Sequence, residues 1–217
     1  MVGAIKHRGP DDAGVHVQDG VGFGHARLSV IDLSEAGHQP MMTGDGRVRV
    51  VFNGEIYNFK ELRAELSQQG HHFHSHTDTE VILKGYHQWG KTVFSRLRGM
   101  FAIALWDASN DEIILARDRV GKKPLFYAWH EGVFLFGSEI KAILACPGFS
   151  RKPELEAIHH YLSLQYVPAP YSAFEGVKKV PQASYMVGSR GGTINVHNYW
   201  KLPQPEEAKH RPIQELQ

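Results

Sequence analysis

The chain has 217 residues, of which 42% are apolar, enough for one large domain or two small ones with a buried core. Its 24 basic and 23 acidic residues give a formal net charge of +1, so electrostatics gives no reason to expect nucleic acid or a membrane surface as a partner. A single cysteine excludes an internal disulfide and suits a reducing compartment, so we expect a cytoplasmic protein. The longest apolar run, Met100 to Trp106, is too short for a membrane span.

The first half of the chain predicts strands followed by helices. Alternating apolar residues bounded by turn residues predict antiparallel strands at 14–17, 21–30 and 47–52. Leu62 and Leu66, four residues apart, predict an amphipathic helix over 58–69. Thr77 and Glu80 have the spacing of a capping box, so a second helix is expected from Asp78 to about residue 89.

The second half returns to strands. Apolar segments at 100–106, 112–117, 125–129 and 133–136 predict four neighbouring strands in a meander. Ser138 is expected to cap a short helix that runs to residue 145, and a longer helix is expected over 154–164. A last hairpin is predicted around Gly191 and Gly192, and the polar tail 203–217 is interpreted as a linker.

This order of elements indicates an α+β fold with mostly antiparallel sheets. Strand groups alternate with helix pairs, without the regular strand and helix alternation of a parallel sheet. The pattern therefore favours a four-layer sandwich, αββα, in which two sheets lie between two layers of helices.

The segment from Val50 to Asn58 is the strongest candidate for chemistry, because an apolar strand runs directly into Asn53, Gly54 and Glu55. An Asn amide and a Gly backbone N–H at such a place can both donate to one developing oxyanion. Asn-Gly is also a common turn dipeptide, and a plain hairpin turn is the alternative interpretation.

Two charged residues strengthen the first interpretation. Arg27 can bind a carboxylate through two hydrogen bonds, and Asp78 can bind an ammonium group, which is the pair that a free α-amino acid requires. Each residue taken alone is interpreted more simply as a surface charge or a helix cap.

Several segments together resemble a known family, the amide-hydrolysing domain of glutamine-dependent asparagine synthetases. Any one of these segments is weak evidence, but their combination in this order is specific and extends over essentially the whole chain. The segments are HRGPDD (7–12), HARLSVIDL (25–33), FNGEIYN (52–58), SHTDTEV (75–81), ARDRVGKKPLFY (116–127), GSEIKAI (137–143) and QYVPAPYSAF (165–174).

The resemblance implies a class II glutamine amidotransferase domain over residues 1–202, with the N-terminal-nucleophile fold. It also implies a substrate, L-glutamine, and a role for each candidate residue. Arg27 would bind the α-carboxylate, Asp78 and Glu55 the α-amino group, and Val30 would line the pocket. Asn53 and the Gly54 N–H would stabilise the tetrahedral intermediate of amide cleavage.

The nucleophile of the family, an N-terminal cysteine on a preceding strand, has no match in this sequence, which begins Met1-Val2. We therefore expect an N-terminally truncated domain that is inactive by itself. Cys146 is interpreted as a structural cysteine, because it follows a predicted helix and matches no catalytic position of the family.

No glycine-rich phosphate loop follows residue 202, so no cofactor is expected in this chain, and ATP and magnesium would belong to a separate synthetase domain that amidates aspartate. That domain is the expected partner, beside glutamine, and a homodimer is a further expectation. Two alternatives remain open at this point. The chain is a catalytically silent glutamine-binding or interface domain, or it serves an acceptor other than aspartate.

Two further segments have competing interpretations. The histidines at 72, 74 and 76 would share one face of a strand, and a solvated strand is favoured over a metal site. The charged run from Arg117 to Lys123 is either a solvated or ion-paired turn or a contact surface for the synthetase domain.

Overall fold

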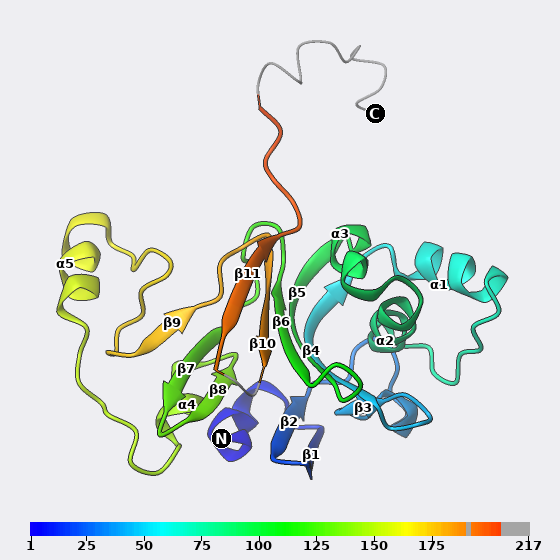
Figure 1. The fold of residues 1–217 in the computed structure, drawn as a ribbon, viewed down its shortest axis with the longest axis horizontal. Helices are drawn as coiled ribbons and strands as arrows, with labels where there is room; N and C mark the ends of the chain where they lie inside the picture. Colours follow the sequence, from blue (N-terminus) through cyan, green and yellow to red (C-terminus); the bar gives the residue numbers. More distant parts are fainter. Residues whose placement is uncertain (190–191, 205–217) are drawn as a thin grey trace.

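The computed structural model describes residues 1–189 and 192–204 and has an α+β fold built around a six-stranded antiparallel sheet (Figure 1). Neighbouring strands of this sheet follow the spatial order β11-β10-β6-β5-β4-β3. The strands are β3 (Met41–Met42), β4 (Val48–Ile56), β5 (Gly99–Asp107), β6 (Glu112–Arg117), β10 (Ser184–Ser189) and β11 (Ile194–Asn198). The predicted hairpin around Gly191 and Gly192 is therefore present as β10 and β11, although Gly191 lies outside the described residues.

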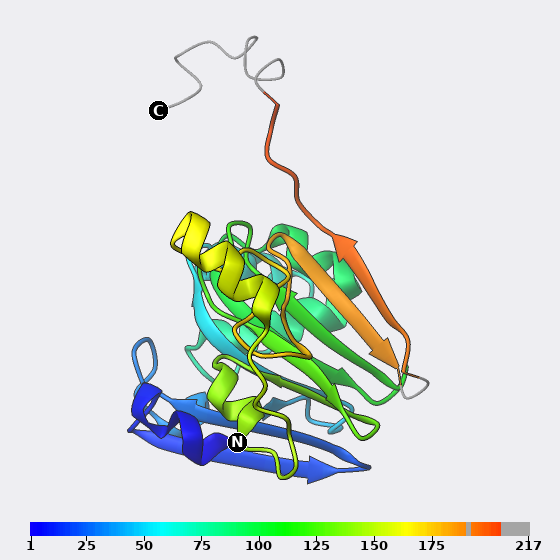
Figure 2. The ribbon, with the colours of Figure 1, turned by 90° about the vertical axis from the view of Figure 1, so that its left-hand side faces the viewer.

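The layer that faces this sheet consists of two smaller sheets. One has the order β8-β7-β9, and the other is the hairpin of β1 and β2. Figure 2 shows the hairpin below the rest of the layer, with the N-terminal 3₁₀ helix beside it. The strands are β1 (Asp12–Gln18), β2 (Val21–Arg27), β7 (Phe126–His130), β8 (Val133–Gly137) and β9 (Val177–Lys179).

Helices cover the outer faces of both layers. On the outer face of the six-stranded sheet, Val50, Phe52 and Ile103 pack against apolar residues of the helices between positions 59 and 96. Between the sheets, Val51 and Trp106 pack with Phe23 and Leu125 of the facing layer. The helices are α1 (Phe59–Gln68), α2 (Asp78–Trp89), α3 (Val93–Arg96), α4 (Ile140–Leu144) and α5 (Leu155–Leu164), with 3₁₀ helices η1 (Val2–Arg8), η2 (Glu35–Gly37) and η3 (Gly90–Thr92). The order of helices, sheet, sheet and helices confirms the predicted sandwich.

Helix α2 begins where its capping residues predict. The Thr77 hydroxyl accepts a hydrogen bond from the Glu80 backbone N–H at 3.2 Å. The Glu80 carboxylate accepts hydrogen bonds from the backbone N–H groups of His74 and Ser75, at 2.7 to 3.1 Å. These contacts fix the first turn of α2, and with it the position of Asp78.

Two predictions about strands are wrong. The four strands from residue 99 to 137 do not form one meander, because β6 pairs with β10 while β7 and β8 belong to the other layer. The turn that follows β6 causes this change of sheet, since it folds around the buried Asp118. The histidine-rich segment 71–77 is a loop rather than a strand, because the backbone N–H groups of His74 and Ser75 donate to Glu80, and that of His76 donates to Asp32, instead of to a neighbouring strand.

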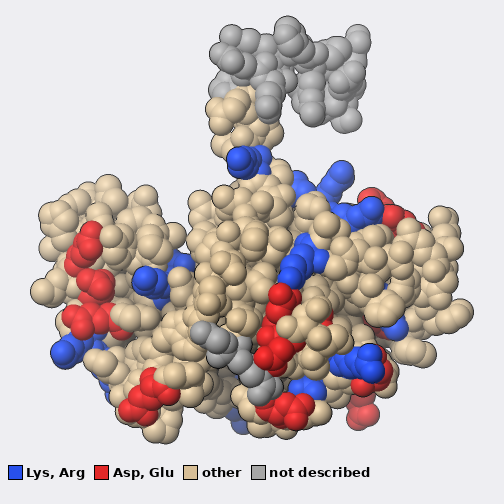
Figure 3. All heavy atoms as spheres, in the orientation of Figure 1, with Lys and Arg blue, Asp and Glu red and all other residues tan. Residues whose placement is uncertain are grey.

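Other features bear on the remaining expectations. Acidic and basic side chains are interspersed over the face drawn in Figure 3. Within the described ranges, every helix is too short or too polar to cross a bilayer. The same ranges contain no cluster of three or more potential metal ligands. The predicted linker at 203–217 lies outside the described residues from position 205 onward.

Candidate active site

The candidate site begins at the edge of β4 that faces away from β5. The Phe101 N–H of β5 donates to the Asp118 carboxylate, and the Phe101 C=O accepts from the Asp118 N–H. Phe101 therefore makes no ladder hydrogen bond with Gly54, the residue opposite it in β4. The N–H groups of Phe52, Gly54 and Ile56 consequently point to the same free edge. Gln39 accepts from Phe52 at 2.7 Å, and Asp78 accepts from Ile56 at 3.0 Å. The Gly54 N–H therefore lies between two anchored neighbours and is directed away from the sheet.

Gly54 is required by packing rather than by ligand approach. A Cβ atom at this position would lie 2.1 Å from the Met100 carbonyl oxygen and 2.8 Å from the Phe101 Cα. Both are backbone atoms of the neighbouring strand, so they cannot move aside cheaply. Gly54 was predicted as a residue of the site, and the close approach that needs a glycine at this position is the approach of β5.

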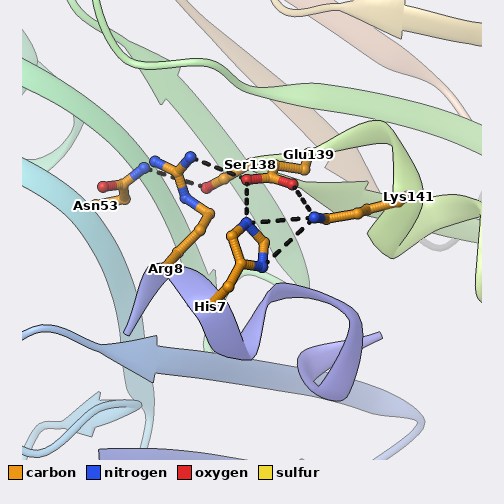
Figure 4. A network of polar contacts seen from close by, with 6 residues as sticks. All are labelled: His7, Arg8, Asn53, Ser138, Glu139 and Lys141. Carbon is orange, nitrogen blue, oxygen red and sulfur yellow. Dashed lines mark hydrogen bonds and ion pairs between the residues drawn. The ribbon is translucent and has the colours of Figure 1, made fainter. Parts of the chain in front are cut away.

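The Asn53 side chain lies on the inner face of β4, between the two layers. Its Nδ2 donates to the Ser138 hydroxyl at 3.3 Å, across a separation of 85 residues (Figure 4). Ser138 was expected to cap α4, and this expectation is wrong. The N-cap of α4 is Glu139, without a side-chain cap hydrogen bond, because the Ser138 hydroxyl faces Asn53 instead.

Arg27 ends β2 and is 8% exposed. Its guanidinium donates to the backbone carbonyls of Ser34, at 2.9 Å, and Asp32, which leaves other N–H groups for a ligand. Gly37 makes this placement sterically feasible, since a Cβ atom there would lie only 2.0 Å from Arg27 Nη2. Sequence reasoning missed Gly37, because only the folded loop brings it against the guanidinium.

Asp78 occupies the first turn of α2 and is 5% exposed. Burial raises the pKa of its carboxyl group, and the negative charge of Glu55 raises it further, although backbone hydrogen bonds from Ile56, Asp78 and Thr79 oppose both effects. Two carboxylates that repel each other at one place gain from a cation between them. This pair is therefore suited to bind an ammonium group.

All six predicted site residues line one cavity of about 810 Å³. Val30 lies at its surface, with 71% of its side chain exposed. The register of β4 and β5 places Ala102 opposite Asn53 and Ala104 opposite Val51. The lining is therefore apolar along β4 from Asn53 toward Val51. The other residues predicted for the site are Arg27, Gly54, Glu55 and Asp78.

Two strands border the cavity with unpaired edges. β2 pairs only with β1, and β8 pairs only with β7, as far as the described strands show. Residues of both strands line the cavity. The N-terminal helix η1 packs against β2 and α4, and its first residue Val2, together with the preceding Met1, also reaches the lining. The cavity is thus bounded by polar groups at the β4 edge and by open strand edges on the facing layer.

His25 of β2 is a further titratable group in the lining that the sequence did not single out for a role. Its Nε2 contacts the Phe52 carbonyl oxygen at 3.1 Å, and its Nδ1 is buried without a hydrogen-bond partner in the described part of the chain. Burial lowers the pKa of His25 to about 4. The imidazole is therefore neutral at physiological pH.

Cys146 lies away from these groups. It follows α4 and packs in a separate apolar cluster with Ile143, Phe149 and other residues of the β7 and β8 layer. It does not line the cavity.

Comparison with known proteins gives consistent results. Residues 1–200 match the family model of a glutamine amidotransferase domain. The chain is 39% identical over 214 residues to glutamine-hydrolyzing asparagine synthetase 3 of Bacillus subtilis (strain 168), a match that covers 97% of this chain and 34% of that protein. It is 45% identical over 194 residues to a putative glutamine-hydrolyzing asparagine synthetase of Mycobacterium tuberculosis (strain ATCC 25618 / H37Rv), covering 83% of this chain and 30% of that protein. The chain thus spans about a third of the length of the curated relatives it matches.

A solved structure agrees at the level of the fold. The glutamine phosphoribosylpyrophosphate amidotransferase from B. subtilis superposes with a TM-score of 0.56 at 18% identity, over 82% of this chain and 34% of that chain. The sandwich is accordingly that of the N-terminal-nucleophile amidotransferases. Because a family model covers nearly the whole chain, and the resemblance read from its motifs is confirmed, the chain belongs to the class II glutamine amidotransferase domains.

Proposed function

We propose that the cavity binds L-glutamine by its α-carboxylate and α-amino groups and presents the side-chain carboxamide for hydrolysis. The observation that carries this proposal is the presence of Arg27, Asp78 and Asn53 in the lining of one cavity. A buried guanidinium with spare donors suits the carboxylate, and the carboxylates of Asp78 and Glu55 suit the ammonium group. The Asn53 amide and the Gly54 N–H are donors that suit the carboxamide oxygen.

The proposed reaction is acyl transfer to a thiolate followed by hydrolysis. The thiolate attacks the carboxamide carbon, and the carbonyl oxygen becomes an oxyanion that accepts hydrogen bonds from Asn53 and Gly54. The C–N bond then breaks and releases ammonia, and the leaving nitrogen takes up the proton that the thiol lost when it became a thiolate. Water hydrolyses the resulting thioester to glutamate and regenerates the thiol.

The attacking thiol is the element that the described cavity does not supply, because Cys146 packs in a different cluster. We propose that the described chain binds glutamine without turnover, and that hydrolysis uses a thiol on a further segment that enters the cavity. Two features support this proposal, the apolar walls of the cavity and the unpaired edges of β2 and β8, since an extended segment can pair with such edges.

The proposed fate of the ammonia is the ATP-dependent amidation of aspartate. Support comes from the names of the relatives, which are glutamine-hydrolyzing asparagine synthetases, and from their greater length. In this proposal a synthetase domain binds ATP and magnesium and is the partner of the chain. A glutamine-binding domain without catalysis is the second candidate, and the position of Cys146 away from the cavity supports it as much as it supports a thiol from a further segment.

Calorimetric titration of the chain with L-glutamine tests the binding proposal, with D-glutamine as the control ligand. We expect saturable binding of the L enantiomer, loss of binding in Arg27→Ala, and no ammonia release above the rate in buffer. Absence of binding in the folded wild-type protein would refute the proposed function. Ammonia release that depends on Cys146 would refute the proposed source of the thiol.

A further inference from the structure

Ser138 connects the two layers of the sandwich at the candidate site. It follows β8 directly, whereas Asn53 lies in β4 of the other layer, and both residues line the cavity. The contact from Asn53 Nδ2 to Ser138 Oγ, at 3.3 Å, is the one side-chain hydrogen bond of Asn53 within residues 1–189 and 192–204. The orientation of this carboxamide is therefore determined from the opposite layer.

Ser138 is itself held in place through its neighbour Glu139. Three cationic or protonatable groups surround the Glu139 carboxylate: His7 Nε2 at 3.1 Å, Arg8 Nη1 at 3.0 Å and Lys141 Nζ at 3.0 Å (Figure 4). His7 and Arg8 end η1, and Lys141 belongs to α4. The contacts thus join η1, the end of β8 and α4 at one carboxylate.

The cluster persists over the physiological pH range. Partial burial raises the pKa of Glu139, but hydrogen bonds from Lys141, Arg8 and His7 outweigh that effect and lower it to about 2. Glu139 therefore remains ionised well below neutral pH, so that Arg8 and Lys141 keep their ionic partner. The ionic contacts of Glu139, the neighbour of Ser138, are therefore retained at neutral pH.

The geometry of the Asn53 amide makes this anchor relevant to the ligand. An Asn side chain has a broad torsional minimum about its terminal bond, so its two N–H groups have no fixed direction without a partner. Ser138 engages one of the two hydrogens of Nδ2. The second hydrogen is then left in a defined direction in the cavity lining.

We propose that Ser138 is a positioning residue, which holds the Asn53 carboxamide so that its second N–H meets the side-chain carbonyl oxygen of L-glutamine. This inference rests on the proposed function. Ser138 acts through Asn53, and the cluster around Glu139 supports Ser138 in turn.

The test compares two ligands that share α-groups but differ at the end of the side chain. L-Glutamine carries the carboxamide, whereas L-norvaline has the same number of side-chain carbons without the carboxamide oxygen and nitrogen. Calorimetric affinities for both are measured with the wild type, Ser138→Ala and Ser138→Thr. The matched control is Ser172→Ala, since Ser172 is a buried serine of the same layer that donates to the Phe174 carbonyl and does not line the cavity.

We expect Ser138→Ala to weaken glutamine binding by about fivefold, as for the loss of one neutral hydrogen bond, and to leave norvaline binding unchanged. Ser138→Thr retains the hydroxyl and should restore the wild-type preference for glutamine. Ser172→Ala should affect neither ligand.

Two binding results would overturn the inference. Equal losses for both ligands would show a general structural effect, and equal glutamine affinity in wild type and Ser138→Ala would show that the contact has no role. If the wild type binds neither ligand, the proposed function itself fails. This outcome is distinguishable from a failure of the inference about Ser138, because it is observed in the wild type alone. A second measurement in the free protein, the ¹H–¹⁵N signals of the Asn53 side chain, should change in Ser138→Ala and not in Ser138→Thr. Unchanged signals in both variants would also contradict the proposal.

Discussion

Asp78 and Asp118 are both buried carboxylates beside the six-stranded sheet, but the protein uses them differently. Asp118 is fully buried and accepts hydrogen bonds from the backbone N–H groups of Phe101, Val120, Lys122 and Lys123. Asp78 accepts one hydrogen bond from outside its own helix, from Ile56, and borders the cavity beside a second carboxylate. Backbone N–H groups of the protein satisfy the hydrogen-bonding capacity of the Asp118 carboxylate, whereas the Asp78 carboxylate retains capacity for a ligand.

The charged run 117–123 contains internal contacts of the kind that the interpretation as a structural turn predicts. Arg117 donates to the carbonyl oxygens of Lys123, Val180 and Gly121, each at 2.8 Å. Together with Asp118, it connects the end of β6 to the following turn and to the segment that contains Val180. Both charges at the start of the run are therefore used internally, which leaves Arg119, Lys122 and Lys123 as the charged side chains of the run for contact with another domain.

The largest expected effect is the loss of stability on replacement of Asp118. Asp118→Asn replaces one acceptor oxygen with an amide that cannot accept, and leaves buried N–H groups without partners. We expect the free energy of unfolding to fall by about 3 kcal/mol, measured by urea denaturation. The exposed Asp45, which accepts from Thr43 and the Arg47 N–H, is the control, and Asp45→Asn should have a much smaller effect. Equal effects of the two substitutions would contradict the structural role of Asp118.

His25 lies between these two cases, since the fold uses one of its ring nitrogens and leaves the other without a partner in the described ranges. Its folded-state pKa of about 4 lies below the ordinary value of 6.5, so the unfolded chain binds the proton more tightly. The free energy of unfolding should therefore fall as pH decreases from about 6.5 to 4, by on the order of 3 kcal/mol from this group.

The comparison that isolates this contribution is the pH dependence of unfolding in wild type and His25→Gln. The variant should lose less stability between pH 6.5 and 4, and the exposed His87→Gln should behave like the wild type. Parallel curves for wild type and His25→Gln would show that His25 does not carry the pH effect.

Replacement of Asp78 should affect binding far more than stability. Asp78→Asn keeps an oxygen for the Ile56 N–H but removes the charge, so we expect L-glutamine affinity to fall roughly 10- to 100-fold in calorimetric titration. Because burial raises the pKa of Asp78 in the folded state, its ionised form opposes folding at neutral pH, and the variant should be no less stable than the wild type there.

The same shift predicts a pH dependence of binding in the wild type. Glutamine affinity should decline on acidification at a pH above 3.8, the ordinary value, as Asp78 becomes protonated. A variant that keeps wild-type affinity, or one that unfolds as readily as Asp118→Asn, would remove the distinction between the two acids.

The smallest expected effect concerns Gly37. Its φ angle is not in the left-handed region, so alanine fits the backbone, but the new Cβ would displace the Arg27 guanidinium. We expect Gly37→Ala to weaken glutamine binding roughly fivefold with little change in stability, because the clash falls on the flexible end of a side chain. Gly44→Ala is the matched control, since a Cβ atom there meets no atom within 4 Å. Unaltered binding in Gly37→Ala would show that the position of Arg27 is unimportant.

The sequence predicted local structure well and long-range placement poorly. The cap at Thr77 and the strand periods are local signals, so α2, β5 and β6 could be located within about two residues. The exchange of sheets after β6 depends on hydrogen bonds of Asp118 to residues up to 17 positions away, which no periodicity records. The prediction of a strand in the histidine-rich segment is wrong for a similar reason, because the Ser75 backbone N–H donates to the Glu80 carboxylate.

The candidate site shows the same difference between local signals, which the sequence records, and long-range contacts, which it does not. Arg27, Asn53, Gly54, Glu55 and Asp78 were predicted from their chemistry and from the family resemblance, and they line one cavity. The residues that support them were missed. Gly37 and Gln39 carry no recognisable motif, and the hydroxyl of Ser138 was assigned to a helix cap because its contact with Asn53 joins two layers.

A crystal structure of the protein with L-glutamine tests the central claim most directly. The account predicts that the α-carboxylate lies on the Arg27 guanidinium, the α-amino group on Asp78, and the carboxamide oxygen within hydrogen-bond distance of Asn53 Nδ2 and the Gly54 N–H. Glutamine bound in the reverse orientation, or at a place outside this cavity, would contradict it.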